Sequence, residues 1–310
     1  MFLIWVAAML VFAFAVDYAI TTGLRRTDIR KYAVWNDIYA SRANADLLVM
    51  GSSETWTGYN TYLLDSLLGV NSYNIAIDGH AFRYQKLRYE TYCRFNDKPK
   101  TIIVNLDPGS LWTDEGYAYE REQFFPFICD QCLIDQIAKD KRITFFDRYL
   151  PFYRYYGYRE DIENGIASFF GKRTFVDGNL HKGYRGEGSV WKPANLSLDT
   201  VFSASTKMAD DLNVFVSERK SEGINVILVE FPEYYKLRKK YSNLDEIETI
   251  YRTIAQHNEI PLLDYSHASI CNDTKYYYNF SHLNKMGSDV FTELLCQDLD
   301  SLLVESNTYY

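Results

Sequence analysis

Two short polar turns, far apart in the chain, carry side chains that could act as a nucleophile and a base. An apolar run over 45–50 stops at Gly51-Ser52-Ser53. Such a run is typical of a buried parallel strand, and open α/β sheets bind ligands beyond the carboxyl ends of their strands. Ser53 would begin a helix there, beside free backbone amides, which suits a hydroxyl that attacks a carbonyl carbon. Alone, however, Gly-Ser-Ser is usually a tight turn, and Thr55 replaces the last glycine of the Gly-x-Ser-x-Gly elbow of α/β-hydrolases.

The second turn contains His282, just ahead of an apolar helical pattern near the other end of the chain. A single histidine in a polar loop is usually a surface residue, but one held beside a serine is a general base. The predicted chemistry therefore requires a fold that brings the loops of Ser53 and His282 together. Glu54 is interpreted as a helix-start carboxylate that complements the helix dipole, and His80 as a structural or surface residue.

The pattern between these turns predicts one large α/β domain. Apolar runs of strand length alternate with segments of helical periodicity, and this alternation predicts right-handed crossovers and a mostly parallel sheet covered on both faces. The predicted strands are 45–50, 70–76, 101–107, 225–231 and 261–265, and the predicted helices are 32–39, 62–68, 82–95, 198–222, 244–257 and a last helix after 282.

Residues 110–193 interrupt this alternation with a segment rich in Tyr, Phe, Arg and Gly. We interpret it as an insertion over the active face that forms part of a substrate cleft. Tyrosines stack on sugars, although most tyrosines simply pack at half-buried positions with the hydroxyl in solvent.

The N-terminal segment 1–22 is predicted to be a hydrophobic helix that serves as a transmembrane anchor or a signal segment. Residues 1–16 carry no charge, and as a helix they would cover roughly 24 Å, somewhat less than a ~30 Å hydrocarbon core. We favour the anchor because the small residues of the competing cleavage pattern, Ala13-Phe14-Ala15, lie inside the apolar run. The cations that follow, Arg25, Arg26, Arg30 and Lys31, would by the positive-inside tendency place the domain in the cytoplasm.

Composition excludes several classes of protein. The formal net charge is −8 and no basic stripe dominates, which argues against a nucleic-acid partner. The five histidines show no ligand pairing, so neither a metal nor a cofactor is expected. A single CxxC, Cys129 to Cys132, is either a local disulfide or two unrelated thiols.

Three blocks together resemble the SGNH/GDSL hydrolase superfamily. They are Gly51-Ser52-Ser53 after the first strand, 74–79 after the second and His282-Leu283-Asn284 before the last helix. The resemblance covers roughly residues 30–302 and is closest to a membrane-anchored branch that accompanies membrane-bound O-acyltransferases in polysaccharide O-acetylation or teichoic acid D-alanylation. It implies a three-layer α/β/α sandwich with a five-stranded flavodoxin-like sheet.

The resemblance also implies roles for single residues. Ser53 would be the nucleophile and His282 the base, while the backbone amides of Ser53 and Gly79 would form the oxyanion hole. Asn105 is the candidate third donor, although the usual Gly-x-Asn-Asp block reads Asn105-Leu106-Asp107 here.

The aspartate that normally precedes the histidine by three residues is Asn279. An asparagine has no charge to stabilise an imidazolium, and it can favour the wrong tautomer of the histidine. In a serine protease, replacing the aspartate by asparagine lowers the rate by about 10⁴. Two alternatives stay open. Either Ser53 and His282 act as a dyad assisted by another carboxylate such as Asp273, or the chain is a weakened or inactive relative.

The expected function is therefore serine-dependent acyl transfer or ester hydrolysis, with O-acetyl groups on an extracellular polysaccharide as the substrate. The expected partners are a glycan or acyl-ester substrate, the membrane and a membrane-bound O-acyltransferase. This function places the domain outside the cytoplasm, against the positive-inside signal. The alternative is a glycan-binding or assembly component of such a system.

Overall fold

Five parallel strands form the central sheet of one of two compact units. The computed structural model describes residues 1–112, 118–137, 140, 142–172, 180–192, 201 and 203–307. The sheet has the order β2-β1-β3-β6-β7, and every neighbouring pair is parallel. The strands are β1 (Leu47–Met50), β2 (Ser72–Asn74), β3 (Thr101–Leu106), β6 (Asn225–Glu230) and β7 (Leu262–Asp264). The predicted flavodoxin-like sheet is confirmed.

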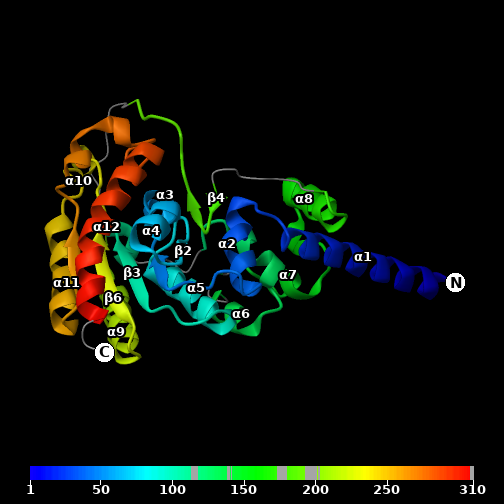
Figure 1. Cartoon of the computed structure of the whole chain (residues 1–310). Coiled ribbons are helices and arrows are strands. Elements are labelled where there is room, and N and C mark those ends of the chain that lie inside the picture. Colours follow the sequence, from blue (N-terminus) through cyan, green and yellow to red (C-terminus); the bar gives the residue numbers. More distant parts are fainter. Residues whose placement is uncertain are drawn as a thin grey trace. The chain divides into compact units, whose positions relative to one another are not determined.

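Helices cover both faces of this sheet (Figure 1). Right-handed crossovers place α4 and α12 on one face and the row of α5, α9 and α11 on the other. These helices are α4 (Thr61–Leu68), α5 (Phe82–Phe95), α9 (Thr206–Ser221), α11 (Leu244–Asn258) and α12 (Lys285–Asn307). The shorter described elements of this unit are α3 (Ser53–Gly58), η1 (Pro108–Leu111), β4 (Leu180–His181), β5 (Tyr184–Arg185), α10 (Tyr235–Arg238), η4 (Ser269–Asn272) and η5 (Thr274–Tyr276).

The core of the sheet unit explains why these segments form strands. Every residue of β1 and β3 is buried, as expected for strands covered on both faces. Val49 and Ile103 pack with Phe291 and Leu295 of α12 in one apolar cluster. Each such side chain contributes about 1.5–3 kcal/mol when fully buried.

Two predicted boundaries differ from the structure. β2 is shorter than the predicted 70–76 and ends at Asn74, although the Ile75 amide still donates to the Val49 carbonyl at 2.8 Å. The predicted helix 198–222 begins only at residue 206, where Ser205 caps it by accepting a hydrogen bond from the Met208 amide at 3.3 Å. Residues 198–200 lie outside the described residues.

The second unit combines Met1–Arg42 with Asp114–Gly178. Its described elements are α1 (Phe2–Leu24), α2 (Arg30–Tyr39), η2 (Arg121–Phe127), α6 (Gln131–Ile137), α7 (Phe145–Tyr149), η3 (Tyr153–Tyr155) and α8 (Arg159–Phe169). The segment 110–193 is therefore divided, since its larger part folds with the N-terminal helices and residues 180–192 belong to the sheet unit. Its expected place over the active face stays a prediction.

α1 is long and apolar enough to cross a membrane or to serve as a signal sequence. Only its C-terminal part is buried, where Gly23 and Gly165 bring α1 and α8 into backbone contact. A Cβ on Gly23 would lie 1.7 Å from the Gly165 carbonyl oxygen, so both glycines are required for this close packing.

Candidate active site

The turn after β1 places Ser53 at the first position of α3. Gly51 precedes it in a crowded position, because a Cβ there would lie 2.0 Å from Thr55 Oγ1 and 2.9 Å from Asn105 Cβ. A glycine is therefore sterically required at position 51 of this turn, which packs directly against the end of β3.

The loop that carries His282 is held by its own hydrogen bonds. The Tyr278 amide donates to the His282 carbonyl at 3.1 Å, and the Asn284 amide donates to the Tyr276 carbonyl at 2.9 Å. Asn284 also donates from Nδ2 to the Lys275 carbonyl at 2.7 Å. These bonds fix the loop ahead of α12 and leave the imidazole with little freedom to move.

The structure brings the two predicted turns together. Ser53 Oγ lies 2.8 Å from His282 Nε2, which is normal hydrogen-bond distance. This is the geometry of a serine nucleophile and its general base.

The other ring nitrogen of His282 contacts two side chains. His282 Nδ1 lies 2.9 Å from Asn279 Oδ1 and 2.8 Å from Ser281 Oγ. Asn279 Oδ1 also accepts the backbone N–H groups of Ser281 at 3.0 Å and His282 at 2.9 Å. Two backbone donors identify this atom as the amide oxygen, so His282 must carry its proton on Nδ1 to bond it. The free Nε2 lone pair then faces Ser53, which is the productive tautomer.

This arrangement corrects one expectation about Asn279. The wrong tautomer arises when an asparagine presents its NH₂ group to the histidine, whereas here backbone amides hold the oxygen toward the ring. The missing negative charge remains. Burial lowers the pKa of His282 to about 4, so the imidazole is a neutral base at neutral pH.

Asp273 does not supply the missing charge. It is a surface residue that caps η5, and its carboxylate pairs with Lys275 Nζ at 3.0 Å. Within the described part of the chain, no carboxylate is hydrogen-bonded to His282. Ser281 is the neighbour that sequence reasoning missed, although its place directly before the histidine was visible.

Asn105 has the chemistry of an oxyanion donor. It is fully buried at the end of β3 beside Gly51, and the Tyr59 hydroxyl donates to its Oδ1 at 2.6 Å. This bond turns the amide so that Nδ2 is the remaining donor, and Nδ2 has no partner among the described residues. A buried donor without a partner is costly unless a ligand uses it. Tyr59 could not be connected to Asn105 from the sequence.

Gly79 lies on the segment that follows β2. The Ile77 amide donates to the Gly51 carbonyl at 3.0 Å, so this segment continues beside the nucleophile turn. Gly79 has a φ of +69°, a left-handed conformation that favours glycine. The neighbouring His80 is a structural residue, since it is buried, its Nδ1 contacts the Asp78 carbonyl and its ring packs on Tyr84.

A group of buried acids adjoins the nucleophile turn. Glu54 was expected to be a helix-start carboxylate, and it does lie in the first turn of α3, but it is buried. Burial, with Glu233 and Asp107 nearby, raises the pKa of Glu54 well above its usual range. Burial also raises the pKa of Glu233 to about 7, although Arg238 opposes this change. The neutral acid form of Glu54 is therefore favoured next to Ser53.

The described residues contain no cluster of three or more His, Cys, Asp or Glu side chains that could hold a metal ion. Cys129 and Cys132 are both exposed free thiols.

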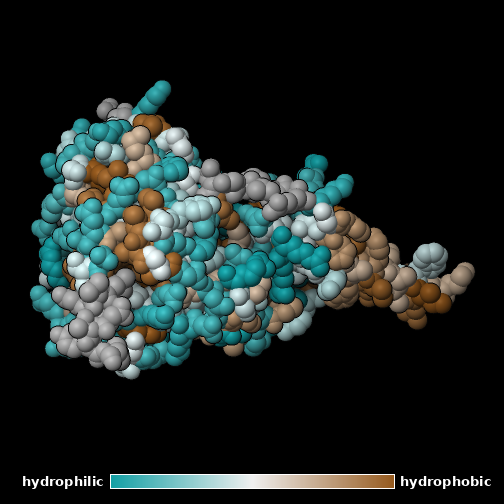
Figure 2. Space-filling view, viewed as in Figure 1, coloured by the Kyte–Doolittle hydropathy of each residue, from teal (hydrophilic) through white to brown (hydrophobic). Residues whose placement is uncertain are grey.

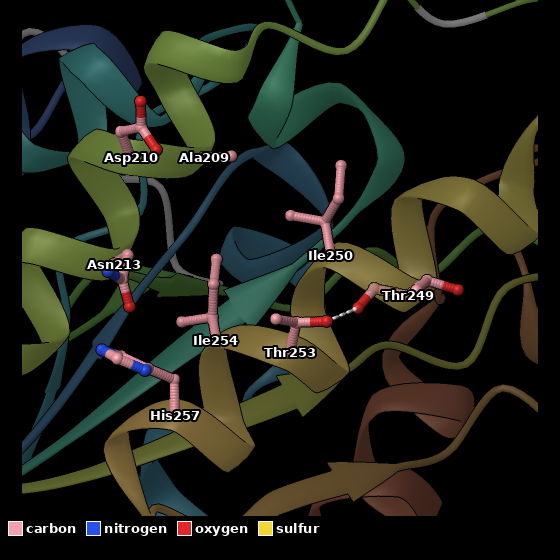
Figure 3. A pocket seen from close by; sticks show the side chains of 8 residues that line it. All are labelled: Ala209, Asp210, Asn213, Thr249, Ile250, Thr253, Ile254 and His257. Atoms are coloured by element: carbon pink, nitrogen blue, oxygen red, sulfur yellow. Dashed lines mark hydrogen bonds between the residues drawn. The ribbon is translucent and has the colours of Figure 1, made fainter.

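A separate cavity of about 380 Å³ lies between α9 and α11 (Figure 3). None of the predicted catalytic residues lines it. Its lining residues are Ala209, Asp210, Asn213, Thr249, Ile250, Thr253, Ile254 and His257.

Comparison with known proteins gives a likeness of fold and nothing finer. No family model matches the chain, and no curated protein matches it. One similar solved structure is "a putative platelet activating factor from Streptococcus pneumonia", with 10% identity over 96% of this chain and 98% of that chain and a TM-score of 0.44. Another is a GDSL-like lipase from Bacteroides thetaiotaomicron, with 12% identity over 87% of this chain and 98% of that chain and a TM-score of 0.40. A third is "a putative acylhydrolase" from Bacteroides fragilis, with 14% identity over 83% of this chain and 87% of that chain and a TM-score of 0.38. Similarity at this level carries no argument about activity, so the function has to be argued from the site.

Proposed function

We propose that this protein is a serine-dependent acyl hydrolase or acyltransferase. The observation that carries the proposal is the 2.8 Å contact between Ser53 Oγ and His282 Nε2, with Asn279 Oδ1 on the opposite ring nitrogen. A hydroxyl and a neutral imidazole in this arrangement perform nucleophilic acyl transfer.

In the first half of the reaction, Ser53 Oγ attacks the carbonyl carbon of an ester while His282 Nε2 takes its proton. The oxyanion is stabilised by the backbone amides of Ser53 and Gly79 and by Asn105 Nδ2. His282 then protonates the leaving alkoxide, the ester C–O bond breaks and the acyl group stays on Ser53. In the second half, His282 deprotonates water or an acceptor hydroxyl, which attacks the acyl-serine. The bond between the acyl carbon and Ser53 Oγ then breaks, and His282 returns the proton to Ser53 Oγ.

Asn279 and Ser281 serve the base in this scheme. Their side-chain oxygens accept the hydrogen bond from Nδ1–H of His282 and so fix the ring. Neither side chain carries a charge to stabilise the imidazolium. We therefore expect an enzyme that is slow on simple esters. The competing proposal, a glycan-binding component that kept the fold and lost activity, is favoured by Asn279 alone.

The proposed acyl group is acetyl and the proposed acceptor is a hydroxyl of an extracellular polysaccharide. Support comes from the resemblance of the three sequence blocks and from α1, which would hold the domain at a membrane. Arg185 of β5 lies over the ring of Trp56 on α3, at 5.4 Å from the ring centroid. Trp56 lies three residues after Ser53 in the sequence, and its ring is buried. The proposed acyl donor is supplied by a membrane-bound O-acyltransferase on the extracytoplasmic side.

The test is acetyl release from p-nitrophenyl acetate by the full chain in detergent, with and without an added glycan. The wild type should release p-nitrophenol, and a glycan acceptor should become acetylated if transfer competes with hydrolysis. Ser53→Ala should abolish both reactions. Ser66→Ala is a matched control, because Ser66 is an exposed helical serine in the same unit. Equal rates for wild type and Ser53→Ala would contradict the proposal and favour the binding role.

A further inference from the structure

An exposed aromatic cluster lies on α7 and the turn that follows it. Its members are Phe145, Phe146, Tyr149 and Tyr153, which are 69%, 53%, 55% and 46% exposed. The rings contact one another, with centroids 4.5 Å apart for Phe145 and Tyr149 and 5.5 Å apart for Phe146 and Tyr153. A contiguous exposed patch of large aromatic side chains indicates a contact surface, because single exposed rings are common but clusters of four are not.

The cluster is tied to a defined level of α1. The Phe152 amide donates to Asp17 Oδ1 at 3.0 Å, and Arg154 forms an ion pair with the same carboxylate. The side chains of Asp17 and Arg154 are only 13% and 6% exposed. Thr21, one turn further along α1, bonds Tyr155 at 2.8 Å. The segment that follows α7 is therefore fixed beside the part of α1 that begins at Asp17.

The position of the first charge in α1 places this level at the edge of a bilayer. Residues 2–16 are uncharged and mostly exposed, and Figure 2 shows hydrophobic colours along α1. Asp17 is the first charged residue after this apolar stretch, so it marks the point at which the apolar stretch ends. Because a charged side chain is costly inside the hydrocarbon core, this point of α1 is expected in the interfacial layer at the edge of that core. Pairing with Arg154 removes the net charge that Asp17 would otherwise carry into that layer.

We propose that the aromatic cluster is a lipid-contacting collar that lies in the interfacial layer of the bilayer and fixes the depth of α1. Tyrosine and other aromatic rings are favoured at this depth, where one end of the side chain is in apolar surroundings and the other in water. Arg148 lies 5.3 Å from the Tyr149 ring centroid, so a cation adjoins the cluster. The proposal concerns membrane placement and is independent of the reaction at Ser53.

The experiment measures the depth of spin labels on the full chain, reconstituted alone in phosphatidylcholine and phosphatidylglycerol vesicles. Cys129 and Cys132 are the exposed thiols and are replaced by serine. A single label is then attached to Phe146→Cys or Tyr149→Cys in the cluster, to Val11→Cys in α1, or to Val214→Cys on α9. Val11 and Val214 are exposed by 70% and 47%, so they serve as the membrane and water references. Collision with oxygen, which concentrates in lipid, is compared with collision with a water-soluble nickel chelate.

For labels in the cluster, the ratio of collision with oxygen to collision with the nickel chelate should be several-fold higher than for the label at Val214. It should be lower than for the label at Val11. A ratio equal to that of Val214, with Val11 in lipid, would overturn the collar while leaving α1 as an anchor. Low collision with both reagents would overturn it as well, because it would show protein rather than lipid covering the cluster. A water-exposed label at Val11 would show that α1 does not lie in a membrane, and it would overturn the proposal as well. Any of these results would leave the test of Ser53 unaffected.

Discussion

Asn279 Oδ1 lies 2.9 Å from His282 Nδ1 and is held there by two backbone amides. This relationship separates two functions that an aspartate performs together in a catalytic triad. Asn279 orients the imidazole and fixes its tautomer, but it adds no negative charge. The chain therefore keeps the geometry of the base and loses part of its electrostatic support.

Restoring the charge should accelerate the reaction. Asn279→Asp keeps an oxygen where the Ser281 and His282 amides donate, and it places a carboxylate beside Nδ1. We expect kcat to rise by about tenfold or more, which is less than the 10⁴ loss seen when an asparagine also imposes the wrong tautomer. Steady-state kinetics on a model ester measure this change. A rate that falls would show that the neutral amide is itself required.

The same substitution should change the pH dependence. Burial lowers the pKa of His282 to about 4, and a general base works only when it is unprotonated. The acid limb of kcat/KM should therefore appear near pH 4 in the wild type. In Asn279→Asp it should move to higher pH, because the carboxylate stabilises the imidazolium. A wild-type limb near 6.5, the usual value for histidine, would contradict the burial seen here.

The effect of pH on the free energy of unfolding should have the opposite sign to the effect expected for an ion-paired histidine. In the unfolded chain His282 binds a proton below about pH 6.5, whereas in the folded protein it does so only near pH 4. The free energy of unfolding should therefore fall as the pH drops from 6.5 toward 4, with His282 as one contributor. His282→Gln should reduce this slope in urea unfolding measured across that range. An unchanged slope would indicate that His282 has the same pKa in the folded and unfolded states, against the burial described here.

The strand pattern predicted the sheet, because runs such as 47–50 and 226–229 are apolar throughout and only a strand covered on both faces buries such a run. Ser53 followed from the rule that ligands bind beyond the carboxyl ends of parallel strands, and His282 from its place before the last helix and from the resemblance of the three sequence blocks. The orientation of the Asn279 amide did not follow, since it depends on two backbone donors that exist only in the folded loop. The pairing of 114–178 with the N-terminal helices also escaped prediction. It rests on contacts such as Asp17 with Arg154, which no local pattern encodes.

Loss of the Asn105 side chain should act on the transition state. Its Nδ2 has no partner among the described residues, so its donor is available to an oxyanion. Asn105→Ala should lower kcat by about 10²–10³ with little change in KM, as expected for one oxyanion donor. Tyr59→Phe removes the 2.6 Å bond that orients this amide and should give a smaller loss of the same kind. A change confined to KM would assign Asn105 to ground-state binding instead.

The ion pair between Asp17 and Arg154 should be essential to the N-terminal unit. Arg154→Ala leaves Asp17 buried without its partner, which costs about 3–5 kcal/mol. Thermal unfolding in detergent should show a lower Tm for Arg154→Ala, and the double variant Asp17→Asn with Arg154→Met should recover most of it. Equal losses in the single and double variants would mean that shape rather than charge holds the two segments together.

The most direct test of the account is covalent trapping of the nucleophile. The full chain is treated with a fluorophosphonate, digested and examined by mass spectrometry, with His282→Ala and Ser66→Ala treated in parallel. The account predicts a single adduct on Ser53 in the wild type and in Ser66→Ala, and a strongly reduced adduct in His282→Ala. An unmodified Ser53 in the folded wild-type protein, or equal labelling without His282, would contradict it.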